Sequence, residues 1–131
     1  MSATIIRNGR IIDPANKRDQ IADLLVVDEK IADVSQLSTL NSQPEEIDAR
    51  GLIVAPGLID IHVHLREPGF GHKETIESGA RAAAAGGFTT IVCMPNTAPV
   101  PDNPGTIAWI KDRASTISRV NIFPTGAISK N

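Results

Sequence analysis

The sequence has little of what would place a protein outside the cell or in a membrane. It contains one cysteine, Cys93, so no intramolecular disulfide can form, and a reducing compartment is the simplest interpretation. No apolar run approaches the roughly 18 residues that a membrane-spanning helix needs. The first residues, MSATIIRNGRIID, have neither a long apolar core nor a small-residue cleavage site, so no signal peptide is expected. We therefore expect a cytoplasmic protein with no membrane partner.

The sequence also lacks the charge pattern of a nucleic-acid-binding protein. The formal net charge is −2, and basic residues form no cluster. Apolar residues make up 41% and charged residues 21% of the 131 positions, which is normal for a globular domain with its own core. We expect no nucleic-acid partner.

The first 56 residues alternate short apolar stretches with turn residues, which predicts strands rather than helices. The expected elements are a strand pair or one bent strand at 4–13, a hairpin of 21–27 with 30–34, and a polar surface loop at 35–46. Pro56-Gly57 is a strong turn signal. We place a domain boundary there, with a first domain at 1–56 and a second at 57–131.

From Leu58 the pattern changes to alternating strands and helices. The expected strands are 58–65, 88–94 and 120–128, and the expected helices are 73–86 and 103–118. This β-α-β-α-β order predicts a parallel sheet. Three parallel strands leave open edges, and a closed (β/α)8 barrel needs about 250 residues. We therefore expect the chain to be truncated, as one part of a larger fold.

The stretch DIHVHLREPG, from Asp60 to Gly69, alternates polar and apolar side chains for seven residues. On a strand this alternation would place Asp60, His62, His64 and Arg66 on one face. Two imidazoles at i and i+2 have the geometry for two ligands of one divalent ion, and imidazole suits zinc, iron or nickel. An isolated pair of histidines at this spacing more often lies on a solvent-facing side of a strand and binds no metal. Three features favour a metal site instead. The strand is the first of a β-α-β series, so both its faces should be covered. The polar row is continuous from Asp60 to Arg66, and it enters a turn at the end of the strand.

Two further polar residues are expected at the ends of neighbouring strands. Arg66 is either a surface cation paired with Glu67 or a planar fork for a substrate carboxylate. Asn96, in MPNT, is either a turn residue or an amide that supports the same anion beside Arg66. His72 is interpreted as a loop residue and Cys93 as a core residue.

The blocks GLIDIHVHLREPGFGHKET and AAAAGGFTTIVCMPNTAPVPD resemble the dihydroorotases, in the type I branch of the amidohydrolase superfamily. The resemblance runs nearly end to end, from IIRNGRIIDP to FPTGAISK. Allantoinases and dihydropyrimidinases share the D-x-H-x-H strand. They are less similar around Arg-Glu-Pro-Gly and His-Lys-Glu, so we rank them second.

The resemblance implies an α/β fold: a distorted (β/α)8 barrel of a metal-dependent hydrolase, preceded by part of a small β-sandwich built from both chain ends. It implies the reversible conversion of N-carbamoyl-L-aspartate to L-dihydroorotate, in pyrimidine biosynthesis. His62 and His64 would bind the more buried of two zinc ions, whose bound water would attack the ring amide. His64, Arg66 and Asn96 would bind the substrate, with Arg66 and Asn96 at its carboxylate.

The remaining metal ligands and the catalytic acid or base are expected beyond residue 131, so no catalytic residue is predicted within this segment, which alone should be inactive. A homo-oligomer and an association with aspartate transcarbamoylase are the expected protein partners. The competing hypothesis is a non-catalytic, dihydroorotase-like scaffold for that transcarbamoylase. Such proteins tend to lose metal ligands, and the presence of both His62 and His64 favours the enzyme.

Overall fold

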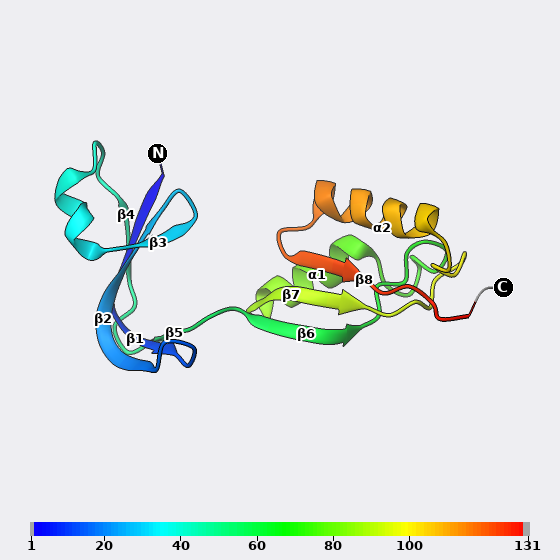
Figure 1. Cartoon of the computed structure of the whole chain (residues 1–131), viewed down its shortest axis with the longest axis horizontal. Coiled ribbons are helices and arrows are strands. Elements are labelled where there is room, and N and C mark those ends of the chain that lie inside the picture. The colour runs from blue at the N-terminus through cyan, green and yellow to red at the C-terminus, as the bar shows by residue number, and fades with distance from the viewer. Residues whose placement is uncertain (1, 130–131) are drawn as a thin grey trace. The chain divides into compact units, whose positions relative to one another are not determined.

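The computed structural model describes residues 2–129, and the chain divides into two compact units at Pro56-Gly57. The first unit is built on a β-sheet, and the second combines a sheet with two helices (Figure 1). In the part of the chain that is described, no helix is long and apolar enough to cross a membrane.

The first unit is a five-stranded sheet in the order β3-β2-β1-β4, with β5 also paired to β1. Its elements are β1 (Ala3–Asp13), β2 (Arg18–Val27), β3 (Lys30–Ala32), the 3-10 helix η1 (Val34–Thr39), β4 (Glu45–Asp48) and β5 (Ile53–Val54). The pairs β1-β2 and β2-β3 are antiparallel, whereas β4 and β5 run parallel to β1. A long central strand therefore organises the unit.

Two local backbone features shape this sheet. β1 is one bent strand, because its register to β2 shifts between Ile6 and Gly9, where Asn8 has a φ of 60°. The predicted hairpin of β2 and β3 is confirmed. Its turn residues Asp28 and Glu29 both take positive φ, at 45° and 65°, without a glycine.

The surface loop predicted at 35–46 is only partly present. A 3-10 helix, η1, occupies its first part, and β4 begins before its end. η1 begins after Asp33, whose carboxylate accepts a hydrogen bond from the Ser35 backbone N–H at 2.8 Å. This capping bond stabilises the start of the helix. Val34 and Leu37, followed by Leu40 at the C-cap, recur every three residues and are half-buried, which is the spacing of a 3-10 helix.

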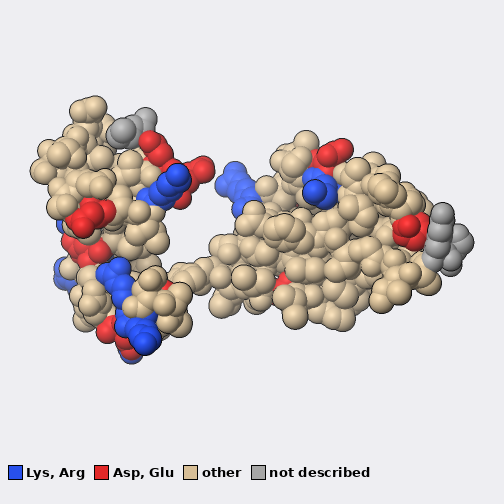
Figure 2. Space-filling model, viewed as in Figure 1, with Lys and Arg blue, Asp and Glu red and all other residues tan. Residues whose placement is uncertain are grey.

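Charged residues of both signs are interspersed on the first unit (Figure 2). Asp23 accepts hydrogen bonds from Arg7 Nη1 at 2.8 Å and from the Asn8 backbone N–H at 3.0 Å. These bonds favour the carboxylate, and they lower the pKa of Asp23. Arg10 forms a two-bond pair with Asp19, at 2.7 Å for each bond. The bonds of Asp23 to Arg7 and Asn8 therefore stabilise the bend in β1, which lies at Asn8.

The second unit is a parallel three-stranded sheet in the order β6-β7-β8, with its helices packed on one face (Figure 1). Its elements are β6 (Leu58–Val63), α1 (Ile76–Ala85), β7 (Phe88–Cys93), α2 (Pro104–Ile117) and β8 (Asn121–Pro124). The predicted β-α-β-α-β order is confirmed. Each strand ends before its predicted end, most clearly β6 at 63 and β8 at 124.

Capping residues set where the two helices begin. α1 begins at Ile76 and not at 73, because Thr75 forms a reciprocal capping box with Ser78. α2 begins at Pro104 after Asn103, whose side chain accepts a bond from the Thr106 backbone N–H at 3.0 Å.

The core of the second unit lies between the sheet and the helices. Its buried members are Leu65, Ile76, Ile91, Cys93, Ile110 and Ala114. On the opposite face, Ile59 and Phe123 stay 64% and 57% exposed. The expectation that both faces of β6 are covered is therefore wrong within the described residues.

Candidate functional site

The candidate site lies where β6 and β7 end. The Met94 backbone N–H donates to the Val63 carbonyl at 2.9 Å, so the segments that follow the two strands leave the sheet side by side. His64 and Arg66 lie in the first of these segments, and Asn96 lies in the second. Carboxyl ends of parallel strands are where α/β folds place their sites.

His62 and His64 lie on the same side of the chain. Their ring centroids are 5.2 Å apart, with the planes at 72°, and both side chains are exposed. Two nitrogens that share one zinc, each at about 2.1 Å, can be no more than about 4.2 Å apart. Rings at this separation can present nitrogens that close together, so the pair fits two positions of one metal ion. Within residues 2–129, no group of three or more His, Cys, Asp or Glu side chains forms a metal site.

The strict alternation predicted for the polar row is interrupted between Asp60 and Val63, because both residues pair with buried core residues of β7. Asp60 pairs with Ile91 and Val63 with Cys93, so three steps along β6 match two along β7. Asp60 and His64 both line a cavity of about 280 Å³ between β6 and α1. The Asp60 carboxylate accepts a bond from the His62 backbone N–H at 2.9 Å.

Asn96 connects His64 with Arg66, and the chemistry of its neighbours fixes the direction of its amide. Arg66 Nη1 can only donate, so it faces the amide oxygen, at 2.8 Å. The Met94 carbonyl can only accept, so it faces the amide nitrogen, at 3.3 Å. His64 Nδ1 lies 2.8 Å from the same amide oxygen and donates its proton to it. One oxygen thus holds both side chains.

Glu67, which the sequence suggested only as an ion-pair partner of Arg66, instead contacts the start of α1. Its carboxylate accepts a bond from the Ile76 backbone N–H at 2.7 Å, at the first residue of α1. No ion pair with Arg66 is present among the described residues, so that alternative for Arg66 is not realised. A carboxylate is favourable at a helix N-terminus, and Glu67 thereby fixes the loop that follows Arg66 to α1.

His72 and Cys93 lie outside the site. His72 is exposed in the loop before α1, and its ring packs edge-on to Phe70 with centroids 6.4 Å apart. Cys93 is 3% exposed and belongs to the core, and this burial raises the pKa of its thiol. Neither residue has the surroundings of a metal ligand or a nucleophile in the described structure.

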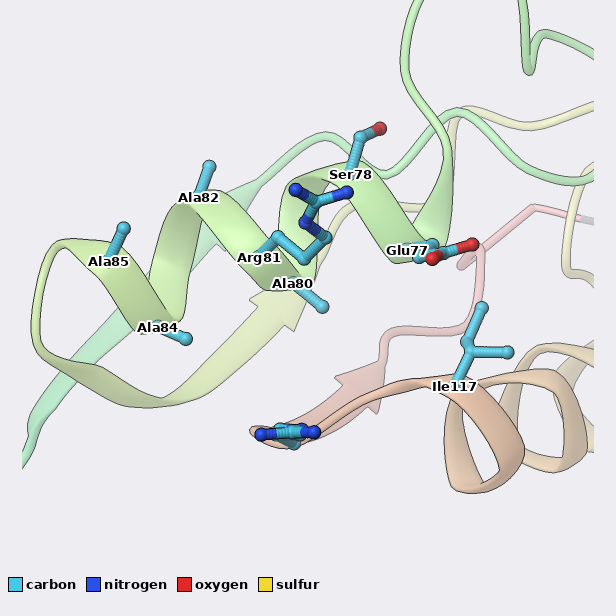
Figure 3. A pocket seen from close by; sticks show the side chains of 9 residues that line it. Glu77, Ser78, Ala80, Arg81, Ala82, Ala84, Ala85 and Ile117 are labelled. Atoms are coloured by element: carbon cyan, nitrogen blue, oxygen red, sulfur yellow. The ribbon is translucent and has the colours of Figure 1, made fainter.

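A larger cavity, of about 870 Å³, lies between α1 and the end of α2 (Figure 3). Its walls include Ala80, Ala84 and Arg81 of α1, together with Ile117 of α2. None of the four candidate site residues lines it. The candidate site is therefore defined by its chemistry and not by the size of the cavity.

The chain matches the family model described as dihydro-orotase-like over residues 51–131. It is 58% identical over 127 residues to the dihydroorotase of Solibacter usitatus and 53% identical over 127 residues to that of Syntrophotalea carbinolica. Each alignment covers 96% of this chain and 29% of the relative. The chain thus spans under a third of the length of these relatives.

Among solved structures, the chain is similar to the L-hydantoinase (dihydropyrimidinase) from Arthrobacter aurescens. The sequence identity is 31% and the TM-score 0.81, covering 96% of this chain and 28% of that one. The predicted fold class is confirmed: the second unit has the strand and helix order that begins an amidohydrolase barrel. The chain belongs to the dihydro-orotase-like family.

Proposed function

We propose that the full-length protein is a zinc-dependent dihydroorotase, which reversibly converts N-carbamoyl-L-aspartate to L-dihydroorotate in pyrimidine biosynthesis. The observation that carries this proposal is the cluster of His62, His64, Arg66 and Asn96 at the ends of two adjacent parallel strands. The similarity to proteins named dihydroorotase supports the same reaction. These relatives are more than three times as long as this chain, so the activity is proposed for the whole protein.

Zinc is the metal we propose, bound by the imidazole nitrogens of His62 and His64. Both rings are exposed on one side of the chain, and their centroid separation of 5.2 Å suits shared coordination. Bound zinc lowers the pKa of a water ligand to about 7 and polarises a carbonyl group. A catalytic zinc usually has three protein ligands, so we propose that further ligands, a second zinc and the general acid or base come from residues outside this chain.

Arg66 is proposed to hold the carboxylate that dihydroorotate and carbamoyl-aspartate share. A guanidinium offers a planar pair of donors, and the Asn96 oxygen already restrains one end of it through Nη1. The amide nitrogen of Asn96 has a second N–H besides the one directed at Met94, and this donor can serve the same anion. We propose that His64 lies at the edge of the bound substrate, because it is held beside Arg66.

The second candidate function is that of a dihydropyrimidinase or an allantoinase. It is favoured by the likeness to the Arthrobacter hydantoinase. The substrates of these enzymes have no ring carboxylate, so the restrained guanidinium of Arg66 would have no anion to bind. This favours dihydroorotate. A non-catalytic scaffold for aspartate transcarbamoylase is less favoured, because both histidines are kept.

A homo-oligomer, an association with aspartate transcarbamoylase and a cytoplasmic location remain parts of the proposal. The experiment that tests the proposed function compares substrates on the full-length protein loaded with zinc. Dihydroorotate should be hydrolysed, and carbamoyl-aspartate cyclised, at least 100-fold faster (kcat/KM) than dihydrouracil or allantoin is hydrolysed, because a lost pair of charge-assisted bonds costs about 3 kcal/mol or more. Preference for dihydrouracil would support the second candidate, and inactivity with all of them would support the scaffold.

A further inference from the structure

The hydrogen bond between His64 and Asn96 determines which imidazole nitrogen carries the proton. A neutral imidazole has one protonated nitrogen and one nitrogen with a free lone pair. Because Nδ1 donates to the Asn96 oxygen at 2.8 Å, the lone pair of His64 lies on Nε2. In the part of the chain that the structure describes, His64 has no other hydrogen-bond partner. Asn96 therefore selects the tautomer by itself.

We infer that Asn96 is a positioning residue, which holds His64 in the Nδ1–H tautomer and the Arg66 guanidinium in one orientation at the same time. This inference rests on the proposed function for the identity of the metal and the substrate. It goes beyond substrate binding by Asn96, because it gives the same amide a role before any substrate arrives. The Asn96 amide thus connects His64, the proposed metal ligand, with Arg66, which is proposed to bind the substrate carboxylate.

The position of Asn96 suits this role because its own side chain is restrained. Its backbone N–H donates to the Met94 carbonyl at 2.9 Å, and its side-chain nitrogen faces that same carbonyl at 3.3 Å. Met94 in turn is bonded to Val63, the last residue of β6. The amide oxygen is thus fixed relative to both strands, whereas His64 lies beyond the end of β6 and is exposed.

The energetic consequence concerns metal affinity. A histidine that binds zinc through Nε2 commonly donates its other N–H to a fixed oxygen, and loss of such a partner typically costs about 10–100-fold in metal affinity. Without the Asn96 oxygen, His64 would populate both tautomers and several ring orientations. Zinc binding would then have to select one of them.

Two substitutions separate this role from a structural one. Asn96→Leu keeps the branched side chain of four heavy atoms and removes the acceptor, whereas Asn96→Asp keeps an acceptor oxygen toward both His64 and Arg66. Asn121→Leu, at an exposed position of β8, is the matched control, because it makes the same chemical change away from the site. The measurements use the full-length protein.

The first measurement is the histidine tautomer in the metal-free protein, from long-range ¹H–¹⁵N NMR correlations, with the His64 signals assigned through a His64→Gln variant. The expected result is an Nδ1–H tautomer in the unchanged, Asn96→Asp and Asn121→Leu proteins, and a mixture in Asn96→Leu. An Nε2–H tautomer in the unchanged protein, or an unaltered tautomer in Asn96→Leu, would overturn the inference.

The second measurement is zinc affinity by competition with a chelator. Asn96→Leu should bind zinc about 10–100-fold more weakly, and Asn96→Asp should bind it about as tightly as the unchanged protein. Equal affinity in Asn96→Leu would overturn the inference, as would equal weakening in both variants. Neither measurement uses a substrate. A protein that lacks dihydroorotase activity but shows these results would refute the proposed function and leave the positioning role in place.

Discussion

The imidazole rings of His62 and His64 lie with their centroids 5.2 Å apart and their planes at 72°. The two histidines come from one strand end, and different neighbours form hydrogen bonds with them. The His62 backbone is bonded to Asp60, whereas the His64 ring is bonded to Asn96. The pair therefore presents two imidazoles side by side, as one divalent ion requires.

Substitution of either histidine should remove zinc. We expect His62→Ala and His64→Ala in the full-length protein to lower zinc affinity by more than the roughly 10–100-fold that loss of an outer partner causes, because each removes a ligand. His72→Ala is the control, since its ring packs against Phe70 outside the site. The check is zinc content after dialysis, by atomic spectroscopy. Full zinc content in either site variant would contradict the assignment of the pair.

Arg66→Lys should weaken substrate binding and leave zinc content unchanged. Lysine keeps the charge but loses the planar pair of donors. A lost charge-assisted hydrogen bond costs about 1.5–3 kcal/mol, which corresponds to a rise in KM for dihydroorotate of roughly 10- to 100-fold. Steady-state kinetics and zinc analysis on the same preparation provide the check. Zinc loss comparable to that of His64→Ala would show that Arg66 supports the metal site instead.

Gly69→Ala should disturb the site more than an equally strained substitution elsewhere. Gly69 has a φ of +94°, and a Cβ there would lie 2.7 Å from the Ala98 side chain and would overlap the Ala98 carbonyl oxygen. This contact joins the segment after Arg66 to the segment after Asn96. The clash should push the two apart, and kcat/KM for dihydroorotate should fall.

Gly87→Ala supplies the control for that prediction. Its φ is +79°, and a Cβ there would meet nothing within 4 Å. It should cost only the strain of a left-handed alanine, about 1–2 kcal/mol in thermal stability, and should leave kcat/KM unchanged. Equal loss of kcat/KM in both variants would show that backbone strain, and not the contact with Ala98, decides the outcome.

Acidic pH should destabilise the first unit, because protonation of Asp23 weakens its hydrogen bonds. Hydrogen bonds from Arg7 and Asn8 lower the pKa of this carboxyl group, with the Arg7 bond as the largest cause. A folded-state pKa below the unfolded value near 3.9 contributes stability above about pH 4, and that stability is lost as pH falls through the folded pKa.

The Asp23→Asn variant should therefore lose protection of β1 and β2 in hydrogen exchange at neutral pH, and its protection should change less on acidification than that of the unchanged protein. Asp112→Asn, at an exposed position of α2, should behave like the unchanged protein. Unaltered exchange in Asp23→Asn would show that the bend in β1 does not depend on this carboxylate.

The sequence alone predicts that the candidate residues lie close together in space, for two physical reasons. Spacing of i and i+2 places His62 and His64 on one side of an extended chain. The β-α-β order places the ends of β6 and β7 next to each other, so Arg66 and Asn96 follow from it as neighbours.

The rest depended on interactions that a single strand does not encode. The break in the alternation of β6 between Asp60 and Val63 arises from its register with β7, which the sequence of one strand cannot reveal. The bond from Ile76 to Glu67 joins residues nine positions apart across a loop. The helix η1 begins at the Asp33 cap, and its Val34 and Leu37 have the three-residue spacing of a 3-10 helix in a stretch that is otherwise polar.

In the proposed function, this chain supplies two zinc ligands and the residue that binds the substrate carboxylate. The most direct measurement is dihydroorotate hydrolysis by the purified full-length protein, before and after zinc removal and after zinc return. We expect hydrolysis to be lost with the metal, restored by zinc, and absent in His64→Ala at every zinc concentration that restores the unchanged protein. Hydrolysis that persists in the metal-free protein or in His64→Ala would contradict the proposal.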